Sequence, residues 1–448
     1  IMSVSMSSSS ANSDPPLELA KQHRVHLNHA GASPSPKQVT DRVLEHLRLE
    51  TELGGYAAQD FVEQSGALRN VYENIATLIN AKSENEIALV ESATVGWTRA
   101  FYAMVQHEEL RLRRERERDL NKTKQQRIRR VILDGTTSTG LVDLTVLQRM
   151  LSGQYQYEDT NGESTLLDPT DIAIVCITHI PTNSGIVNDV ESIGEQIEAF
   201  NQHQQQGKNA RSLWYLVDAC QSVGQLEIDV EKIRCHALVA TGRKYLRAPR
   251  GTGFLYISEE LLEQGVMPSH VDHYGCPVSS VPLPSSYQDG VQLQQETVIQ
   301  YKPRESASRF EFWESSVSNR LGLGEAVHFA MEQGMPQVAR SILELSALLR
   351  SRLSKIPGLM IHHENTTKCG IVTFQCSGLE SRAVVNALWE KGFELSVVPA
   401  TSTPMDSSRT GVPDLVRASL TYVTTEEEIE AFCSALVGYL TEQKTRTI

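Results

Sequence analysis

The chain has 448 residues, 40% of them hydrophobic, and a formal net charge of -13 with a pI near 5.5. This length predicts two domains, because single hydrophobic cores stop growing at about 250–300 residues. The acidic charge argues against nucleic acid or an anionic membrane surface as a partner. Seven scattered cysteines without a CxxC pair indicate neither a disulfide framework nor a metal site, and they favour a reducing, cytoplasmic compartment.

The N-terminal stretch, IMSVSMSSSSANSDPP, has neither the basic region nor the apolar region of a secretory signal. We expect residues 1–22 to form a flexible tail on a soluble protein without membrane spans, and a trimmed transit peptide is the alternative. Farther along, residues 105–130 contain ten Lys or Arg against five acids and hardly any apolar residue. This composition predicts a solvated helix or disorder and no buried strand, with a basic binding arm as the alternative.

Four short apolar runs then follow, and we predict that each is a strand buried on both faces of a mainly parallel sheet. An amphipathic helix over residues 190–200 separates the first two runs, which is typical of an α/β domain. The runs are DIAIVCITHI (171–180), SLWYLVDAC (212–220), HALVAT (236–241) and GFLYIS (253–258).

Beyond Phe310 the pattern changes to longer helices around one apolar strand, CGIVTFQC (369–376), which predicts a smaller α+β domain. Helices are expected over residues 318–334, 338–356 and 380–392, and a last helix runs from Thr425 to Thr441. We therefore place a large domain at residues 23–318 and a small domain at residues 319–448.

Polar residues follow three of the predicted strands: HIPTNSG (179–185), DACQ (218–221) and TGRK (241–244). In an open parallel sheet, ligands bind beyond the carboxyl ends of the strands. Asp218, with Lys244 26 residues later, supplies what pyridoxal 5′-phosphate needs, a carboxylate for its pyridine nitrogen and an amine for a Schiff base. Taken singly, Asp218 has an alternative role as a helix N-cap and Lys244 as a surface lysine.

The stretch VDACQSVGQLEIDVEKIRCHALVATGRKYLRAPRGTGFLYIS resembles the core of the class V aminotransferase family, which has fold type I of the pyridoxal-phosphate enzymes. That family includes cysteine desulfurases, isopenicillin N epimerase-like proteins and ergothioneine-pathway carbon–sulfur lyases. The resemblance extends from about residue 26 (HLNHAGASPSP) to about residue 429 (VRASLTYVTTEEEI). It implies a fold-type-I architecture, with a mainly parallel sheet in the large domain and a smaller α+β C-terminal domain.

By this resemblance, Lys244 is the Schiff-base lysine and Asp218 the partner of the pyridine nitrogen. Gln221 would hydrogen-bond the ring hydroxyl, and Asn183 would lie beside that oxygen and the substrate. Arg417 in VRASL resembles the arginine that binds the substrate α-carboxylate, with a surface ion pair as the alternative.

The phosphate would be held by the ESATVGW turn, where Ala93 and Thr94 adjoin the N-terminus of a helix, and by Thr241 and Arg243. The lyase-like branch also has an arginine before the lysine. The segment FEFWESSVSNR (310–320) resembles one that reaches the phosphate of the neighbouring subunit, which implies a homodimer.

Two features depart from the family pattern. Residues 105–130 replace the strand and helix that carry the ring-stacking residue, and Trp97 or residues 134–140 are candidates to cover the ring instead; core packing is the simpler role for Trp97. Residues 393–408 contain no cysteine, although persulfide-forming desulfurases carry their nucleophilic cysteine there. Cys369 and Cys376 flank an apolar run, and we expect both to be packing residues.

We therefore expect a pyridoxal-phosphate enzyme that acts on an amino acid, as a carbon–sulfur β-lyase on a cysteine derivative. An aminotransferase or an amino-acid epimerase of the same fold is an alternative within enzymes. A catalytically impaired homologue that still binds the cofactor is a further alternative.

Overall fold

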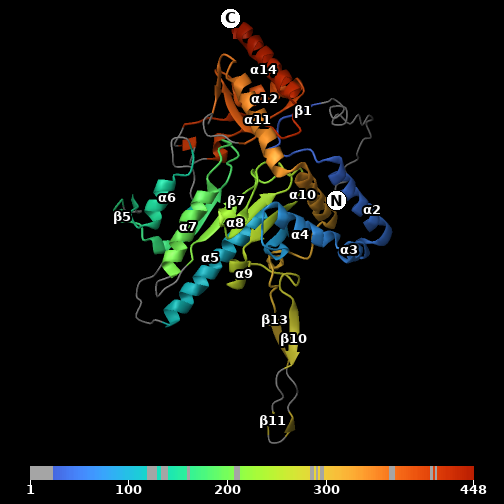
Figure 1. Ribbon diagram of the computed structural model, residues 1–448, viewed down its shortest axis with the longest axis vertical. Helices are drawn as coiled ribbons and strands as arrows, with labels where there is room; N and C mark the ends of the chain where they lie inside the picture. Colours follow the sequence, from blue (N-terminus) through green and yellow to red (C-terminus); the bar gives the residue numbers. More distant parts are fainter. Residues whose placement is uncertain are drawn as a thin grey trace, which may run out of the picture.

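A six-stranded sheet lies at the centre of the computed structural model, with strand order β2-β9-β8-β7-β6-β3 (Figure 1). The strands are β2 (Ile87–Val90), β9 (Gly253–Ile257), β8 (Ala237–Thr241), β7 (Trp214–Asp218), β6 (Ile172–Thr178) and β3 (Arg129–Ile132). The structure describes residues 24–118, 129–132, 140–158, 162–205, 212–282, 287–288, 291–292, 297–362, 369–403, 407–408 and 411–447.

The four predicted apolar runs form four of these strands, β6 to β9, and this prediction is confirmed. Strands β3, β6, β7 and β8 pair in parallel, whereas β9 runs antiparallel to both β8 and β2. Lys244 therefore follows the carboxyl end of β8 and precedes the amino end of β9.

Helices cover both faces of the sheet, which explains why its strands are apolar on both sides. In β7, Tyr215 and Val217 face one apolar cluster, while Trp214 and Leu216 face the other. The first cluster includes α4 (Ala67–Leu78), α7 (Val190–Gln205), α8 (Val230–Ile233) and α10 (Val317–Gln333), and the second lies against α5 (Ala93–Arg118).

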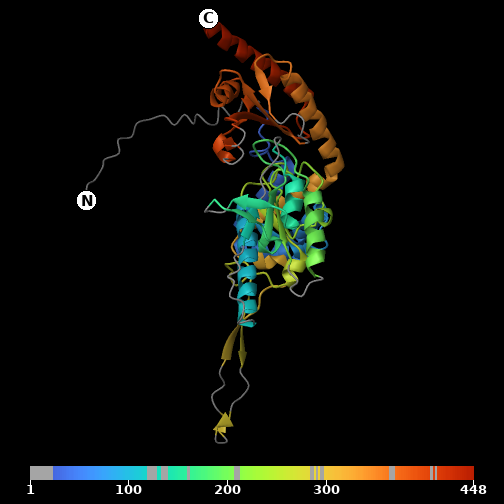
Figure 2. The same ribbon diagram turned by 90° about the vertical axis from the view of Figure 1, so that its left-hand side faces the viewer.

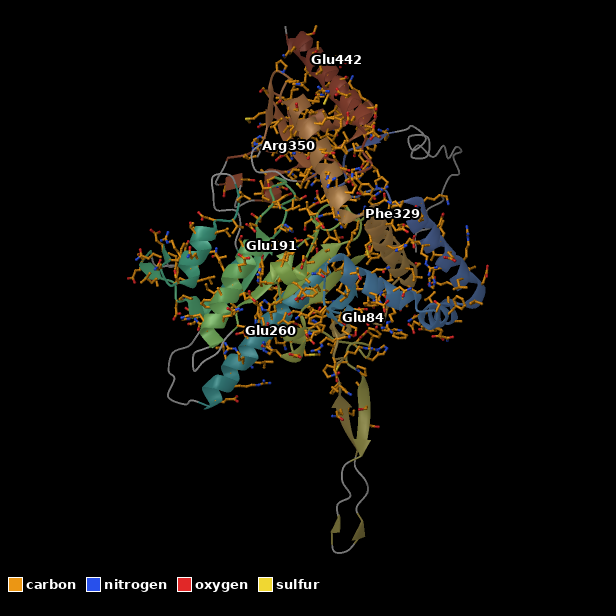
Figure 3. All side chains as sticks on the ribbon, viewed as in Figure 1. Glu84, Glu191, Glu260, Phe329, Arg350 and Glu442 are labelled. Carbon is orange, nitrogen blue, oxygen red and sulfur yellow. The ribbon has the colours of Figure 1, made fainter. Side chains whose placement is uncertain are left out.

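The small domain contains an antiparallel four-stranded sheet of order β14-β15-β18-β17 and lies above the large sheet in Figure 1. Its strands are β14 (Leu359–Ile361), β15 (Ile371–Cys376), β18 (Leu415–Ser419) and β17 (Ser396–Val398), and its helices are α11 (Met335–Leu353), α12 (Ser381–Glu390) and α14 (Glu426–Thr447). In Figure 3, Arg350 marks α11; its Nη2 donates to the carbonyl of Ile371, 2.7 Å away. The N-terminal strand β1 (Val25–His26) pairs with β16 (Phe393–Glu394), so the start of the described chain joins this domain.

Helix α10, marked by Phe329 in Figure 3, packs against α4 and against α2 (Lys37–Leu53) of the large domain. The domain boundary at residues 318 and 319 stays a prediction. The other helices are α3 (Gly55–Gln64), α6 (Leu144–Leu151), α9 (Glu259–Glu263) and the short 3-10 turns η1 (Glu84–Glu86), η2 (Pro169–Asp171), η3 (Ala307–Phe310) and η4 (Ala400–Ser402). Among the described helices, none combines the length and apolarity needed to cross a bilayer.

A two-stranded arm projects from the large domain, on the side away from the small domain (Figure 2). It is formed by β10 (Val278–Pro282) and β13 (Thr297–Tyr301), with β11 (Tyr287–Gln288) and β12 (Val291–Gln292) near its tip. A second hairpin, β4 (Gln156–Glu158) with β5 (Ser164–Leu166), follows α6.

The basic segment differs from its prediction in two ways. Its first part continues α5 to Arg118, and one face of that helix is buried. Trp214 Nε1 donates to the buried Glu108 carboxylate at 3.2 Å, and Leu112, one helical turn after Glu108, is also buried. Its end forms β3, which pairs in parallel with β6, so a sheet strand forms where a solvated helix or disorder was predicted. β3 lies at the edge of the sheet.

Candidate active site

The register of the sheet brings three loops to one edge. Asp218 is paired with Thr178 of β6 on one side and with Val239 of β8 on the other. Because these strands are parallel, the residues after β6, β7 and β8 emerge at the same edge, which is the usual ligand site of such sheets. The three polar stretches singled out in the sequence are therefore neighbours.

Lys244 is half-buried at this edge, and burial lowers the pKa of its ammonium group. The nearby Cys220 and Asp218 oppose that change, while the positive Arg243 and Arg417 add to it. A lysine with a lowered pKa more readily supplies a neutral amine, which is the form that acts as a nucleophile or base.

Asp218 ends β7 and accepts a hydrogen bond from the amide of Cys220 at 2.9 Å. Burial raises the pKa of the Cys220 thiol, and the neighbouring Asp218 carboxylate raises it further. This hydrogen bond closes the turn that follows β7. Asp218 therefore does not act as a helix N-cap through this contact.

The start of α5 lies near the end of β8, with β9 between them. Gly253 is paired with Thr241 on one side and with Val90, three residues before Ala93, on the other. A side chain at Gly253 would meet the Ala240 carbonyl at 2.5 Å and the Ala93 amide at 3.4 Å, so glycine allows this close approach.

Helix α5 begins at Ala93, with Thr94 exposed in its first turn. Arg243 folds back so that its Nη1 donates to the hydroxyl of the buried Thr241 at 3.0 Å. The free amides of a helix N-terminus and a nearby guanidinium together suit a phosphate.

The side chains of Gln221 and Asn183 are buried, and each is oriented by neighbours that accept from its amide nitrogen. Gln221 Nε2 donates to the Ala30 carbonyl at 3.1 Å and to Thr182 Oγ1 at 2.9 Å. Asn183 Nδ2 donates to Thr403 Oγ1 at 2.8 Å, from the small domain. Within the described part of the chain, Gln221 Oε1 and Asn183 Oδ1 have no hydrogen-bond partner.

Arg417 reaches this site from β18 of the small domain and is only 6% exposed. Its Nη1 donates to Thr182 Oγ1 at 2.6 Å, and its Nη2 donates to Asn28 Oδ1 at 3.2 Å. Among the described residues no acidic side chain pairs with Arg417, and its Nε has no partner. The surface ion pair considered as its alternative role is therefore not formed.

These features fit the cofactor that the resemblance implied. A lysine with a lowered pKa and a carboxylate lie near each other at the strand ends, and an anion-binding helix start lies at the same edge. The unpartnered oxygens of Gln221 and Asn183 and the unpaired charge of Arg417 are groups that a polar ligand would satisfy, because buried polar atoms are rarely left without partners. Among the described residues there is no cluster of His, Cys, Asp and Glu that could hold a metal ion.

Two residues of this network, Thr182 and Asn28, were not singled out in the sequence. Both lie within quoted motifs, Thr182 in HIPTNSG and Asn28 in HLNHAGASPSP. Neither side chain is charged, so the sequence alone did not mark them as functional. Their role as acceptors for Arg417 depends on the meeting of three segments that are far apart in the sequence.

Of the two candidates to cover the cofactor ring, Trp97 is half-buried against the apolar cluster under α5, which agrees with a packing role. Residues 134–140 lie outside the described residues except for Gly140. Cys369 and Cys376 are both buried, as expected of packing residues.

The segment 310–320 contains a fully buried carboxylate, Glu311. It accepts hydrogen bonds from the Leu89 amide at 2.9 Å and from Tyr72 at 3.0 Å, and it pairs with Arg320 at 3.1 Å. Leu89 belongs to β2, just before the turn into α5, so Glu311 ties this segment to the proposed phosphate side. Trp313 in the same segment is 40% exposed.

Comparison with known proteins agrees with this architecture. A family model described as class-V aminotransferase matches residues 25–432. The chain is similar to a probable cysteine desulfurase of Synechocystis sp., with 26% identity over 92% of this chain and 90% of that protein. It is similar in fold to the cysteine desulfurase CsdA of Escherichia coli, with a TM-score of 0.69, 17% identity and coverage of 96% and 99%.

A third similar fold is that of the cystine C–S lyase C-DES in complex with cysteine persulfide, with a TM-score of 0.65, 19% identity and coverage of 94% and 98%. The family match spans nearly the whole chain and both domains. The chain therefore belongs to the class-V aminotransferase family, a family of pyridoxal-phosphate-dependent enzymes.

Proposed function

We propose that the protein is a pyridoxal-phosphate-dependent carbon–sulfur lyase that acts on a cysteine derivative. The observation that carries this proposal is the buried Arg417, which has no acidic partner in the described part of the chain and lies near Lys244. A buried cation without an anion is costly, and a substrate carboxylate would relieve that cost. An amino acid held there would lie near Lys244.

Each residue has a defined task in this proposal. Arg417 holds the α-carboxylate, and the neutral amine of Lys244 takes the α-proton as general base. Asp218 would keep a proton on the pyridine nitrogen of the bound cofactor. When bound, pyridoxal phosphate supplies an electron sink for the electron pair left on the α-carbon.

The remaining residues hold the cofactor. The amides at the start of α5, at Ala93 and Thr94, would bind the phosphate together with Thr241 and Arg243. Gln221 and Asn183 would line the ring-hydroxyl side. All of these side chains come from the sheet edge or from loops that its register aligns.

The proposed reaction breaks the Cα–H bond and the Cβ–S bond of the substrate. The sulfur leaves as a thiol, and water hydrolyses the remaining aminoacrylate to pyruvate and ammonia. Two features favour release of the sulfur over its storage on a protein thiol. Residues 393–408 contain no cysteine, and the raised pKa of Cys220 leaves little thiolate there. A relative of the same fold is a C–S lyase.

The test is a visible spectrum of the cofactor-loaded protein before and after addition of cysteine conjugates, with pyruvate, ammonia and thiol assayed together. Equal amounts of the three products are expected, and Lys244→Ala should abolish them. Transfer of the amino group to an added keto acid without pyruvate would identify an aminotransferase, and racemised substrate without products would identify an epimerase. A protein that takes up no cofactor would be the impaired homologue.

We also propose that the protein works as a homodimer. The segment 310–320 carries the exposed Trp313, which lines a cavity of about 270 Å³ together with Tyr56, itself 73% exposed. Large exposed aromatic side chains of this kind favour an interface. Light scattering should give twice the chain mass, and Trp313→Arg should shift it toward the monomer; a monomeric wild type would refute the dimer.

The compartment that we propose is a reducing one, the cytoplasm. All seven cysteines are free thiols, and six of them are buried or partly buried in the apolar clusters rather than paired. Fractionation of the cells that produce the protein would test this.

A further inference from the structure

The hydroxyl of Thr182 lies between two side chains that the proposed function uses. Gln221 Nε2 is 2.9 Å from Thr182 Oγ1, and Arg417 Nη1 is 2.6 Å from the same atom. The three residues come from the loop after β6, the loop after β7, and β18 of the small domain. One hydroxyl therefore joins the glutamine on the cofactor side to the arginine on the substrate side.

The chemistry of the two neighbours determines how this hydroxyl is used. A guanidinium contains no hydrogen-bond acceptor atom, so Arg417 must donate to Thr182. Gln221 must also donate, because its Nε2 faces the Ala30 carbonyl as well, and a carbonyl can only accept. Both lone pairs of Thr182 Oγ1 are thus occupied by donors.

The proton of the Thr182 hydroxyl consequently remains available. No acceptor within hydrogen-bond distance is found for it in the parts of the chain that the structure describes. Thr182 is half-buried, and a hydroxyl with both lone pairs in use can act only as a donor, so its proton can be given to an oxygen from outside the chain.

The position of that oxygen follows from Arg417. Its other terminal nitrogen donates to Asn28 at 3.2 Å, and its Nε is buried without a partner. No described acidic side chain neutralises the guanidinium. A carboxylate bound against Arg417 would meet a cation and a hydroxyl donor fixed 2.6 Å apart.

We propose that Thr182 is a specificity-determining residue for α-amino acids, whose hydroxyl donates to the substrate carboxylate held by Arg417. The same hydroxyl keeps Arg417 and Gln221 in position, so that it couples the carboxylate to the cofactor side of the site. This proposal rests on the proposed function, because it requires the substrate carboxylate to bind at Arg417.

The test compares two ligands that differ in the carboxylate and lack a β-leaving group, L-alanine and ethylamine. Their binding to the cofactor-loaded protein is measured by titration of its visible absorption, for the wild type, Thr182→Val and Thr182→Ser. Valine has nearly the same shape without the hydroxyl, and serine keeps the hydroxyl. Thermal denaturation of each variant checks that the fold is retained.

We expect Thr182→Val to weaken the binding of L-alanine by about 10- to 100-fold, the range for a hydrogen bond to a charged group. The binding of ethylamine should change less than about threefold, and Thr182→Ser should restore the binding of L-alanine to near the wild-type value. A purely structural role would weaken both ligands alike.

The outcomes separate this proposal from the proposed function. If wild type and Arg417→Lys bind L-alanine no better than ethylamine, the carboxylate does not bind at Arg417, and the proposed function fails along with this inference. If Arg417→Lys loses the preference but Thr182→Val keeps it, Thr182 has no part in recognition and only this inference is refuted. Equal weakening of both ligands by Thr182→Val also refutes it.

Discussion

Gly224, in the turn after β7, sets how closely the segment that carries Lys244 can pack. Its φ is +88°, and a Cβ there would lie 2.5 Å from the Leu246 nitrogen and 2.5 Å from the carbonyl carbon of Tyr245. Those atoms belong to the two residues that follow Lys244. We predict that Gly224→Ala destabilises the protein and displaces the lysine.

The expected loss has two parts. A non-glycine residue at positive φ costs about 1–2 kcal/mol, and forcing extra atoms into a packed region costs about 1–3 kcal/mol. The free energy of unfolding of Gly224→Ala should therefore fall by roughly 2–5 kcal/mol. Urea denaturation followed by tryptophan fluorescence measures this, since Trp214 lies in the central sheet.

Gly251→Ala is the matched control. Gly251 has a φ of +78°, but nothing lies within 4 Å of its virtual Cβ, so it should show the backbone cost alone. Because a displacement of about 1 Å at a reacting group can cost on the order of 100-fold in rate, pyruvate release by Gly224→Ala should fall far more than by Gly251→Ala. Equal stability losses in the two variants, or normal turnover in Gly224→Ala, would refute the close packing against the lysine segment.

Three further predictions concern buried titratable groups. Burial lowers the pKa of His179 to about 4, against about 6.5 in the unfolded chain. The buried neutral imidazole therefore makes its full contribution to the free energy of unfolding above pH 6.5. That contribution is lost as the pH falls toward 4, because the unfolded chain binds the proton first. Between pH 7 and pH 5, the free energy of unfolding of His179→Gln should therefore fall by about 2 kcal/mol less than that of the wild type, as measured by urea titration. Equal falls in the two proteins would contradict this. Glu311→Ala leaves the partly buried guanidinium of Arg320 without its fully buried carboxylate partner and should cost about 3–5 kcal/mol in the same assay, whereas a loss below about 1 kcal/mol would contradict a strong buried ion pair. Burial, and then Asp218, raise the pKa of Cys220, so iodoacetamide at pH 8 should leave it unmodified until the protein is unfolded, as read by peptide mapping; rapid labelling of the native protein would exclude a raised pKa.

Much of the fold could be predicted from local patterns. Residues 172–178 and 214–218 are strands where continuous apolar runs indicated them, and α7 begins at Val190 as predicted. β3 could not be predicted, because Arg129 and Arg130 join a sheet only through the edge that β6 offers. The small-domain strand that carries Arg417 was likewise not predicted as a strand; its neighbours in the antiparallel sheet stabilise it.

The sequence by itself indicated the cofactor chemistry, because Asp218 and Lys244 lie at the ends of apolar runs, a local pattern that involves no distant contact. The family followed from the resemblance of the stretch around these two residues. Only the tertiary structure decided how Arg417 is used. Its partners, Thr182 and Asn28, lie 235 and 389 residues away in the chain. A side-chain hydrogen bond forms over about 3 Å, and no local pattern records which distant segments come that close. The arrangement of donors around the Thr182 hydroxyl exists only after the sheet register and the packing of the two domains have brought those segments together.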